Sequence, residues 1–339
     1  MQLPVDLQNK INELYLEFSK KELTETQAGL TKKYKEQTGD SKSLINSKKD
    51  SLVYSISRMP ATYSVIFSLV KNLVKQGFLD NIEKIADVGS GTGAGYFALS
   101  DIFNDASFLL FERDKFMIDI FSKLVDGKIQ PIKTDIVKDD VEIDADLTIA
   151  SYVLSEMTEN DRLLTVKKLL PKGNSSLLLI DTGTPEVYRQ FMQIKNHIQK
   201  QGYFVVAPCV SKNCMLENDY CQFYARVERS AIHRIIKNAT LSYEDEKYFY
   251  LLIQKEDFKN KQSRVIRRPR FAPNIVEHTL CMSDGVKKKI FTKREKELFK
   301  RAKKAEINDV LWEDIRWNLK FLKQKKVSNI LKLVRIKNV

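Results

Sequence analysis

Residues Ile85 to Gly95 read IADVGSGTGAG, and this stretch decides the fold that the sequence predicts. An apolar run ends in Asp87, and a helical pattern begins shortly afterwards. Between them, glycines stand at three alternate positions, Gly89, Gly91 and Gly93. Because glycine tolerates positive φ angles and leaves the backbone uncovered, the stretch predicts a strand, a tight turn and a helix start. A ligand can approach backbone N–H groups closely at such a turn.

Apolar runs and helical patterns alternate from Lys84 onward, which predicts a parallel sheet with crossover helices. Residues 1–80 also read as helices, with Pro60 placed to start one of them. The predicted fold class is therefore α/β, a doubly wound nucleotide-binding sheet preceded by a helical region. Strands are expected at residues 85–89, 107–112, 129–134, 146–151, 176–181, 203–208 and 247–255.

Polar side chains stand where the first four predicted strands end. Ligands of doubly wound folds bind at the carboxyl ends of the strands, near the first glycine turn. Taken alone, Glu112 can equally be a surface carboxylate and Asp135 a cap or turn residue. Together these positions predict a cofactor site made of Asp87, Gly89, Gly91, Gly93, Glu112, Asp135 and Ser151.

Two cofactor classes fit this outline, NAD and S-adenosylmethionine (SAM). An acid two residues before G-x-G-x-G resembles the motif of class I SAM methyltransferases, whereas dinucleotide folds use G-x-G-x-x-G. The spacing therefore favours SAM. No catalytic residue is assigned, because SYVLSEM stands where N-P-P-Y would follow the fourth strand. Cys209 remains an alternative, as a nucleophile for pyrimidine C5 methylation.

The chain has four cysteines, three of which fall within thirteen residues. Neither gap in that group is the C-x-x-C of a zinc ribbon. Disulfides are rare inside cells, so the grouping indicates a metal or redox site. The residues alone leave zinc, a [4Fe–4S] cluster and unrelated buried thiols open. The candidate ligands are Cys209, Cys214, Cys221 and Cys281.

Nearly all of the net charge of +13 lies at the end of the chain. Residues 286–339 hold 18 Lys and Arg against 6 Asp and Glu, a net charge of +12. A basic terminal segment favours a polyanionic partner, most often RNA. The alternative is a solvated helix face.

Two arginine groups extend this basic character. In RVERSAIHRIIK, Arg226, Arg229, His233 and Lys237 have helical spacing and are expected on one helix face. That face can contact phosphate, donate hydrogen bonds to cluster sulfurs, or pair with the acidic residues 244–246. The second group lies in RVIRRPR. Few aromatic residues accompany the arginines, so we expect binding of folded rRNA by its backbone and shape. The candidate RNA contacts are Arg226, Arg229, Arg264, Arg267, Arg268 and Arg270.

Several segments between residues 56 and 305 resemble a known family, in that family's order. They include SRMPATYSVIFSLV, IADVGSGTGAG, IASYVLSEM, IDTGTPEVYRQFM, DYCQFYARVERSAIHRIIK and LCMSDGVKKKIFTKREKELFKRAKKA. The chain is similar to the small-ribosomal-subunit methyltransferase-like proteins of mitochondria and bacteria. The resemblance implies a class I SAM-methyltransferase core, a role in small-subunit assembly, and a [4Fe–4S] cluster held by the four cysteines, with zinc as the alternative.

The predicted function is that of a SAM-dependent rRNA methyltransferase, or a methyltransferase-derived factor, which binds small-subunit rRNA and assists assembly of the immature small ribosomal subunit. One alternative is a non-catalytic RNA-binding scaffold with a vestigial SAM site. Another is a zinc-stabilised methyltransferase of a different substrate.

Four regions are expected along the chain. They are a helical region (1–80), a methyltransferase core (81–255) with a cysteine-bearing insert (207–230), an Arg-rich segment (256–285) that elaborates the sheet, and a basic helical tail (286–339). Composition is that of a globular protein, and no apolar run is long enough for a membrane span. Without a recognisable leader, the protein is expected to be cytoplasmic and monomeric, with the mitochondrial matrix as the alternative location.

Overall fold

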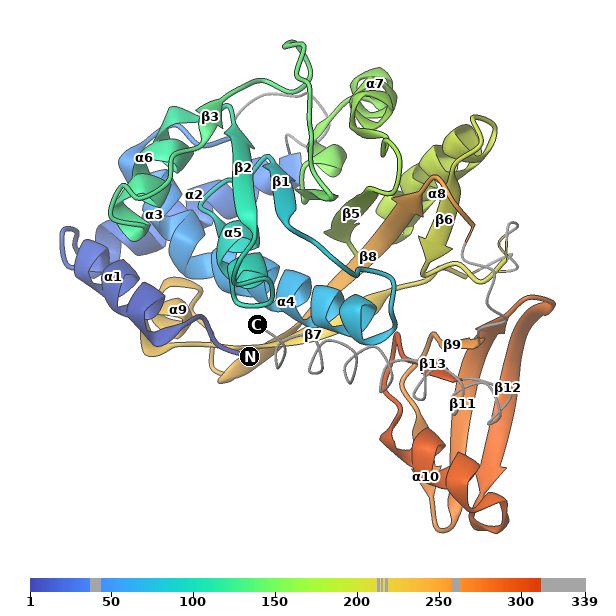
Figure 1. Ribbon diagram of the computed structural model, residues 1–339. Helices are drawn as coiled ribbons and strands as arrows, with labels where there is room; N and C mark the ends of the chain where they lie inside the picture. The colour runs from blue at the N-terminus through green and yellow to red at the C-terminus, as the bar shows by residue number, and fades with distance from the viewer. Residues whose placement is uncertain (37–43, 212–213, 215, 217–218, 258–262, 312–339) are drawn as a thin grey trace, which may run out of the picture. The chain divides into compact units, whose positions relative to one another are not determined.

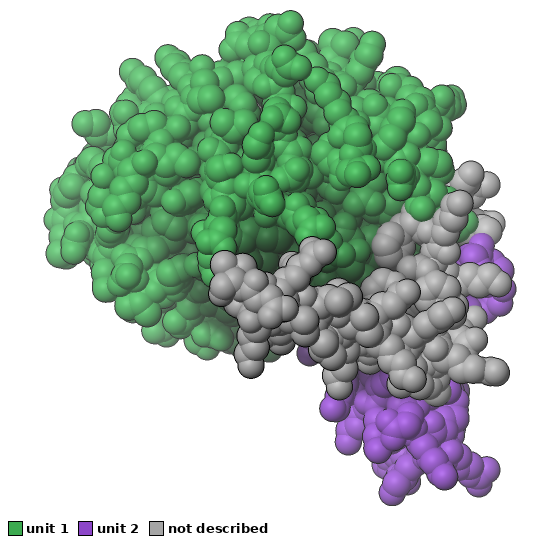
Figure 2. Space-filling view, viewed as in Figure 1, with its two compact units in different colours: residues 1–258 green, residues 259–339 purple. Residues whose placement is uncertain are grey.

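The computed structural model describes residues 1–36, 44–211, 214, 216, 219–257 and 263–311 (Figure 1). The chain divides into two compact units, residues 1–258 and 259–339 (Figure 2). This division differs from the predicted one, in which the Arg-rich segment elaborated the central sheet. The strands that follow residue 262 pair only with one another in the described residues, so they form a separate sheet.

Helices dominate the described part of residues 1–80. Pro60 lies in the first turn of the last of them, as the sequence predicted, where its missing N–H leaves no hydrogen bond broken. That helix is largely buried and packs against α5 (Ala94–Ser100), β7 (Phe223–Glu228) and β8 (Tyr243–Gln254). It therefore connects the helical layer to the sheet. Within the described ranges, no helix combines the length and the apolar character needed to cross a membrane. The helices are α1 (Val5–Tyr15), α2 (Lys20–Glu36), α3 (Lys48–Ser57) and α4 (Met59–Lys75).

The central sheet has eight strands in the described residues, in the order β3-β2-β1-β4-β5-β8-β6, with β7 pairing to β8. Strands β3, β2, β1, β4 and β5 are parallel neighbours. Strand β8 is antiparallel to β5, β6 and β7. The predicted strands are all present, although the third is only two residues long. The bounds are β1 (Lys84–Val88), β2 (Ser107–Glu112), β3 (Ile132–Lys133), β4 (Leu147–Ser151), β5 (Ser176–Thr182), β6 (Phe204–Ala207), β7 (Phe223–Glu228) and β8 (Tyr243–Gln254).

The antiparallel strand β8 distinguishes a sheet of the NAD-binding type from one of the SAM-binding type, the two cofactor classes that fit the outline of the sequence. A dinucleotide-binding sheet continues in parallel through its sixth strand. Here an antiparallel strand is inserted between β5 and β6, which is the arrangement of class I SAM methyltransferases. The predicted fold class is confirmed.

Crossover helices connect the parallel strands, and side chains fix where they begin. Asp114, Thr158 and Thr184 each accept a hydrogen bond from a backbone N–H in the first turn of the helix that follows. These caps place each helix start just beyond the carboxyl end of a strand. The elements are α5 (Ala94–Ser100), α6 (Lys115–Leu124), the 3₁₀ turn η1 (Leu154–Glu156), α7 (Glu159–Leu169) and α8 (Pro185–Gln199).

The predicted basic helix face in RVERSAIHRIIK is wrong. Arg226 lies on strand β7, and the helix that follows, α9 (Ala231–Ile236), begins only after the N-cap Ser230. The reason is the alternation of Phe223, Ala225 and Val227, which are buried while their neighbours are more exposed. A period of two favours a strand over a helix.

The second unit has its own sheet and apolar core. Its strands lie in the order β10-β11-β9-β13, and β12 pairs with β11. Val265, Val276, Leu280 and Phe291 form the core with residues of the helix α10. The predicted helical tail therefore begins with a strand, and residues 312–339 lie outside the described residues. The bounds are β9 (Ser263–Val265), β10 (Arg270–Ala272), β11 (Ile275–Met282), β12 (Gly285–Thr292), η2 (Lys293–Glu295), α10 (Glu297–Lys304) and β13 (Val310–Leu311).

Candidate functional site

A cleft of about 820 Å³, including space open to solvent, lies at the carboxyl ends of β1, β2 and β4. Five of the seven predicted cofactor residues line it: Gly89, Gly91, Glu112, Asp135 and Ser151. The sequence did not indicate the residues that come from the helical region and line the same cleft, Tyr34, Leu44, Ile45 and Tyr54.

The glycine turn after β1 presents its backbone to the cleft. Gly89, Gly91 and Gly93 have φ angles of 71°, 55° and 90°, which side chains rarely adopt. A Cβ on Gly91 would meet only a carbonyl oxygen 4.0 Å away, so this side of the turn is open. A Cβ on Gly93 would clash with the ring of Phe121, so Gly93 serves packing and does not line the cleft.

Glu112, at the end of β2, ties the turn to the next strand. One carboxylate oxygen accepts the Gly91 N–H at 2.8 Å, and the other accepts the Asp114 N–H at 2.8 Å. Burial raises the pKa of Glu112, although these hydrogen bonds act in the opposite direction. Each carboxylate oxygen has a second acceptor position, so Glu112 can still receive hydroxyl donors from the cleft.

Asp87 lies behind the turn and does not line the cleft, which corrects the prediction of a direct cofactor contact. Its side chain is buried, and neither carboxylate oxygen has a hydrogen-bond partner among the described residues. A Cβ on Gly95 would clash with this carboxylate. Burial, with a contribution from the charge of Glu112, raises the pKa of Asp87 to about 7. Asp87 therefore shapes the turn from within the protein.

Glu156 is an acidic side chain that lines the cleft and was missed by the sequence analysis. Glu156 stands in the 3₁₀ turn after β4, within the SYVLSEM stretch. Burial raises its pKa to about 7, against the attraction of Arg113. The only signal available was its position just after the fourth strand, close to the predicted cofactor residue Ser151.

Three of the four cysteines belong to a segment bounded by two strands of the same sheet. Cys209 follows β6 and Cys221 precedes β7, and both strands pair with β8. The register places Ala207 opposite Leu252 and Phe223 opposite Tyr248, so the strands that bound the segment pair with positions of β8 that are four residues apart.

Tyr188 of α8 contacts this cysteine-bearing segment. Its hydroxyl oxygen lies 2.8 Å from the Cys214 sulfur. Its pKa is raised first by burial and then by Cys214, Cys221 and Cys209 in turn, so all three thiols are near it. As they stand, no three His, Cys, Asp or Glu side chains in the described ranges are arranged to hold a metal ion. Cys281 lies on β11 in the second unit and is partly buried.

The family model of the mitochondrial small ribosomal subunit protein Rsm22 matches residues 48–312 of the chain. The chain belongs to the Rsm22 family. No curated protein matches it significantly.

Several solved structures resemble this Rsm22-family protein at low identity. A proposed RNA methyltransferase from Pyrococcus horikoshii is 15% identical over 70% of this chain and 99% of its own, with a TM-score of 0.37. The magnesium protoporphyrin IX methyltransferase of Synechocystis PCC 6803, with bound SAM, is 14% identical over 67% and 91%, with a TM-score of 0.38. The plantazolicin methyltransferase BpumL is 15% identical over 74% and 99%, with a TM-score of 0.42. Scores this low assign no residues, and the fold rests on the strand order.

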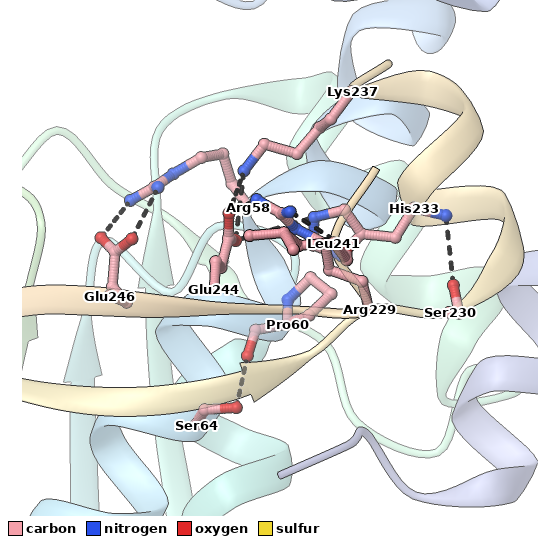
Figure 3. A network of polar contacts seen from close by, with 10 residues as sticks. All are labelled: Arg58, Pro60, Ser64, Arg229, Ser230, His233, Lys237, Leu241, Glu244 and Glu246. Atoms are coloured by element: carbon pink, nitrogen blue, oxygen red, sulfur yellow. Dashed lines mark hydrogen bonds and ion pairs between the residues drawn. The ribbon is translucent and has the colours of Figure 1, made fainter. Parts of the chain in front are cut away.

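An acidic run at the start of β8 pairs with basic side chains in this Rsm22-family protein (Figure 3). Glu244 lies 3.0 Å from the Lys237 amino group and also accepts from the Arg229 guanidinium. His233 is buried 3.7 Å from Glu244, and burial lowers its pKa to about 4. Arg229 is thus paired with a carboxylate of the protein itself. The sequence analysis gave this pairing with residues 244–246 as the alternative to an RNA contact.

The next two acidic residues of the run are paired as well. Asp245 holds the half-exposed Arg226 with a separation of 2.9 Å, and Glu246 lies 3.1 Å from Arg58. The Arg58 guanidinium also lies over the ring of Tyr152, 5.6 Å from its centroid. These contacts join the start of α4 to β8 and to the end of β4.

The four arginines of RVIRRPR differ in exposure. Arg264 is fully buried and donates to both oxygens of Asn308, so its prediction as an RNA contact is wrong. The chain buries it because β9 lies between β11 and β13. Arg267 is partly buried and donates to a backbone carbonyl, whereas Arg268 and Arg270 are exposed.

We expect Asp87→Asn to change how stability depends on pH. The ordinary pKa of this carboxyl is 3.8 and its folded value is about 7, so the folded protein keeps a proton that the unfolded chain has lost between these values. The wild-type free energy of unfolding should therefore fall as pH rises through this window. In Asp87→Asn the free energy of unfolding should fall less over this pH range, and the part of the fall that is due to Glu156 should remain. Urea unfolding at a series of pH values measures the effect, with substitution of the exposed Asp80, Asp80→Asn, as the control. If the free energy of unfolding has the same slope against pH in wild type and Asp87→Asn, the raised pKa is not that of Asp87.

Proposed function

We propose that this Rsm22-family protein binds SAM in the cleft and acts, as a monomer, on small-subunit rRNA or in assembly of the immature small ribosomal subunit. The observation that carries the proposal is the open glycine turn at the carboxyl ends of β1 and β4, in a sheet whose β8 is antiparallel. The family match to a small-ribosomal-subunit protein supports the ribosomal partner.

The residues that line the cleft suit SAM. The backbone of Gly89 and Gly91 receives the cofactor, Glu112 accepts its ribose hydroxyls, and Asp135 and Ser151 border the remaining wall. Bound SAM supplies an electrophilic methyl group. Glu156 lines the same cleft. Its pKa of about 7 suits it to act as a general base at neutral pH, so it can take a proton from the molecule that receives the methyl group.

A non-catalytic RNA-binding scaffold is the second candidate function. The SYVLSEM stretch favours it, since it has no N-P-P-Y to hold a base amine at the end of β4. In that case the cleft is a vestigial SAM site. A zinc-stabilised methyltransferase of another substrate is a third candidate. The family description names the mitochondrial ribosome, which supports the matrix location, while the cytoplasmic location stays a prediction.

Cys209, Cys214, Cys221 and Cys281 are the proposed ligands of a [4Fe–4S] cluster. The chain supplies the donors that such a cluster takes, four thiols, and one of them, Cys214, lies 2.8 Å from the Tyr188 hydroxyl oxygen. The same four thiolates also suit tetrahedral zinc. A bound cluster supplies a redox centre and free energy of folding.

The RNA contacts are proposed at exposed cations of the second unit. Arg268 and Arg270 are exposed, and an arginine fork suits bidentate phosphate contacts. Arg267 stands between them and the buried Arg264 and is a weaker candidate. Arg226 and Arg229 are paired with carboxylates, and Arg229 is largely buried. Arg270 also lies 3.8 Å from Glu277, but its side chain stays 80% exposed and accessible to a phosphate group.

Gly91→Val should weaken SAM binding by about tenfold or more, which corresponds to about 1.4 kcal/mol. The new side chain would project into the open side of the turn. Gly77→Val is the matched control, because Gly77 has a similar positive φ and open surroundings away from the cleft. Isothermal titration calorimetry with SAM measures both. Wild-type protein that does not bind SAM would remove the cofactor from the proposal, and equal loss in the two variants would remove the assigned site.

Replacing Arg268 and Arg270 together with alanine should weaken binding to small-subunit rRNA. The slope of log affinity against log salt should become shallower by about 1 for each phosphate group that the variant no longer neutralises. Lys20→Ala with Lys21→Ala removes the same charge from exposed positions on α2 and serves as control. Filter binding across salt concentrations gives the slopes. If the control lowers affinity equally, only net charge matters and the surface is wrongly assigned.

Protein purified without oxygen should contain iron and acid-labile sulfide in equal amounts and absorb broadly in the visible range. Cys281→Ser should lower the iron content and the melting temperature, because loss of one ligand releases the metal and its folding energy. Metal analysis with calorimetric melting measures both quantities. Zinc in place of iron supports the zinc-stabilised alternative, and full iron retention in Cys281→Ser removes Cys281 from the ligand set.

A further inference from the structure

Strand β10 of the second unit carries an exposed aromatic ring. Its three residues, Arg270, Phe271 and Ala272, are all exposed, although the strand pairs with β11. Phe271 is 61% exposed, and it is the only exposed phenylalanine among those that the structure describes. A single apolar side chain at a surface is common in soluble proteins, so its surroundings must decide whether it binds anything.

The hairpin of β10 and β11 fixes the backbone of Phe271. The register places Phe271 opposite Val276, which is buried in the core of the second unit. Two residues, Pro273 and Asn274, connect the strands, and the carbonyl of Asn274 accepts the N–H of Lys293 at 3.0 Å. The turn is therefore tied to the end of β12. An aromatic ring on such a hairpin is presented to solvent with little conformational entropy left to lose on binding.

Exposed cations flank Phe271 on both sides of the hairpin. Arg268 and Arg270 precede it, and the Arg270 side chain is 80% exposed. Lys293 and Arg294, both exposed, stand at the turn end, where the N–H of Lys293 meets the turn. An apolar ring between cations matches a ligand that has a flat apolar part between negative charges.

Two features of this unit favour RNA over a peptide as that ligand. An edge strand can pair with an added peptide strand through its N–H and C=O groups. Here Pro269 and Pro273 flank β10, and proline has no N–H to donate, which is a common protection of strand edges. Residues 263–311 also hold 14 Lys and Arg against 6 Asp and Glu, a net charge of +8 that complements phosphate groups.

We propose that Phe271 stacks on one unpaired nucleobase of a single-stranded RNA segment, whose phosphate groups contact the exposed arginines Arg268 and Arg270. The inference rests on the proposed RNA contacts of the second unit. Every nucleobase has a π face that can stack on an aromatic ring, whereas the base faces of a duplex are already stacked on one another. The ring therefore adds a preference for unpaired RNA to the contacts with the backbone.

Phe271→Leu tests the proposal, because it removes the aromatic face and keeps an apolar side chain. The matched control is Ile290→Ala, which removes apolar surface from a residue of the same unit that is 54% exposed. Fluorescence anisotropy measures the binding of the full chain to a labelled single-stranded RNA of mixed sequence and to the same strand annealed to its complement. Phe271→Leu should weaken binding to the single strand about tenfold and leave binding to the duplex unchanged. Ile290→Ala should leave both unchanged.

A second variant and the salt dependence separate stacking from folding and from charge. Phe271→Trp keeps an aromatic face, so it should bind the single strand at least as tightly as wild type. The slope of log affinity against log salt should be the same in Phe271→Leu and wild type, because no charge is lost.

Wild-type protein that binds neither RNA overturns the proposed RNA contacts and this inference with them. If wild type binds RNA and Phe271→Leu binds the single strand equally well, the inference alone is overturned and the exposed ring is left for a protein partner. Equal losses on single strand and duplex, or a loss that Ile290→Ala reproduces, also overturn it, because neither depends on an unpaired base.

Discussion

The hydrogen bond from the Gly91 N–H to the Glu112 carboxylate holds the cleft in shape. It joins the turn after β1 to the end of β2, while the other carboxylate oxygen holds the N–H of Asp114 at the start of α6. One buried side chain therefore fixes two loops at the same edge of the sheet. Without it, two largely buried N–H groups would lose their partner, at a cost of about 1–3 kcal/mol each.

Buried carboxylates around this edge oppose the stability that packing provides. Asp87, Glu112, Glu156 and Asp181 all have raised pKa values, and in each case burial is the largest cause. Such groups persist where a function requires them, because replacing them with apolar residues would remove the cost. A positively charged ligand lowers that cost, and the sulfonium and ammonium groups of SAM have the appropriate sign. The electrostatics of the cleft and the proposed cofactor are thus mutually consistent.

The sequence predicted the central sheet well because several strands are short apolar runs, as in SLLLI, and that length favours a buried strand over a helix. It failed for β7, where arginines at helical spacing concealed the alternation of Phe223, Ala225 and Val227. The second unit was missed because its core residues lie on short strands among charged and polar neighbours, as Val276 and Leu280 do in IVEHTLCM. The glycine turn and the strand ends predicted five of the residues that line the cleft. Tyr34 and Tyr54 were not, because no local pattern links a distant helix to a turn after β1.

The position of the cysteines follows from the sheet more than from their own segment. Strands β6 and β7 both pair with β8, so the segment from residue 209 to residue 221 begins and ends beside the same strand. Closing a loop costs conformational entropy, and here strand pairing has already closed it before any ligand binds. Tyr188 and Lys195 then restrain Cys214 and Ser211 within that loop. For the proposed metal site, less entropy would therefore remain to be lost by these three thiols than by cysteines in an open chain.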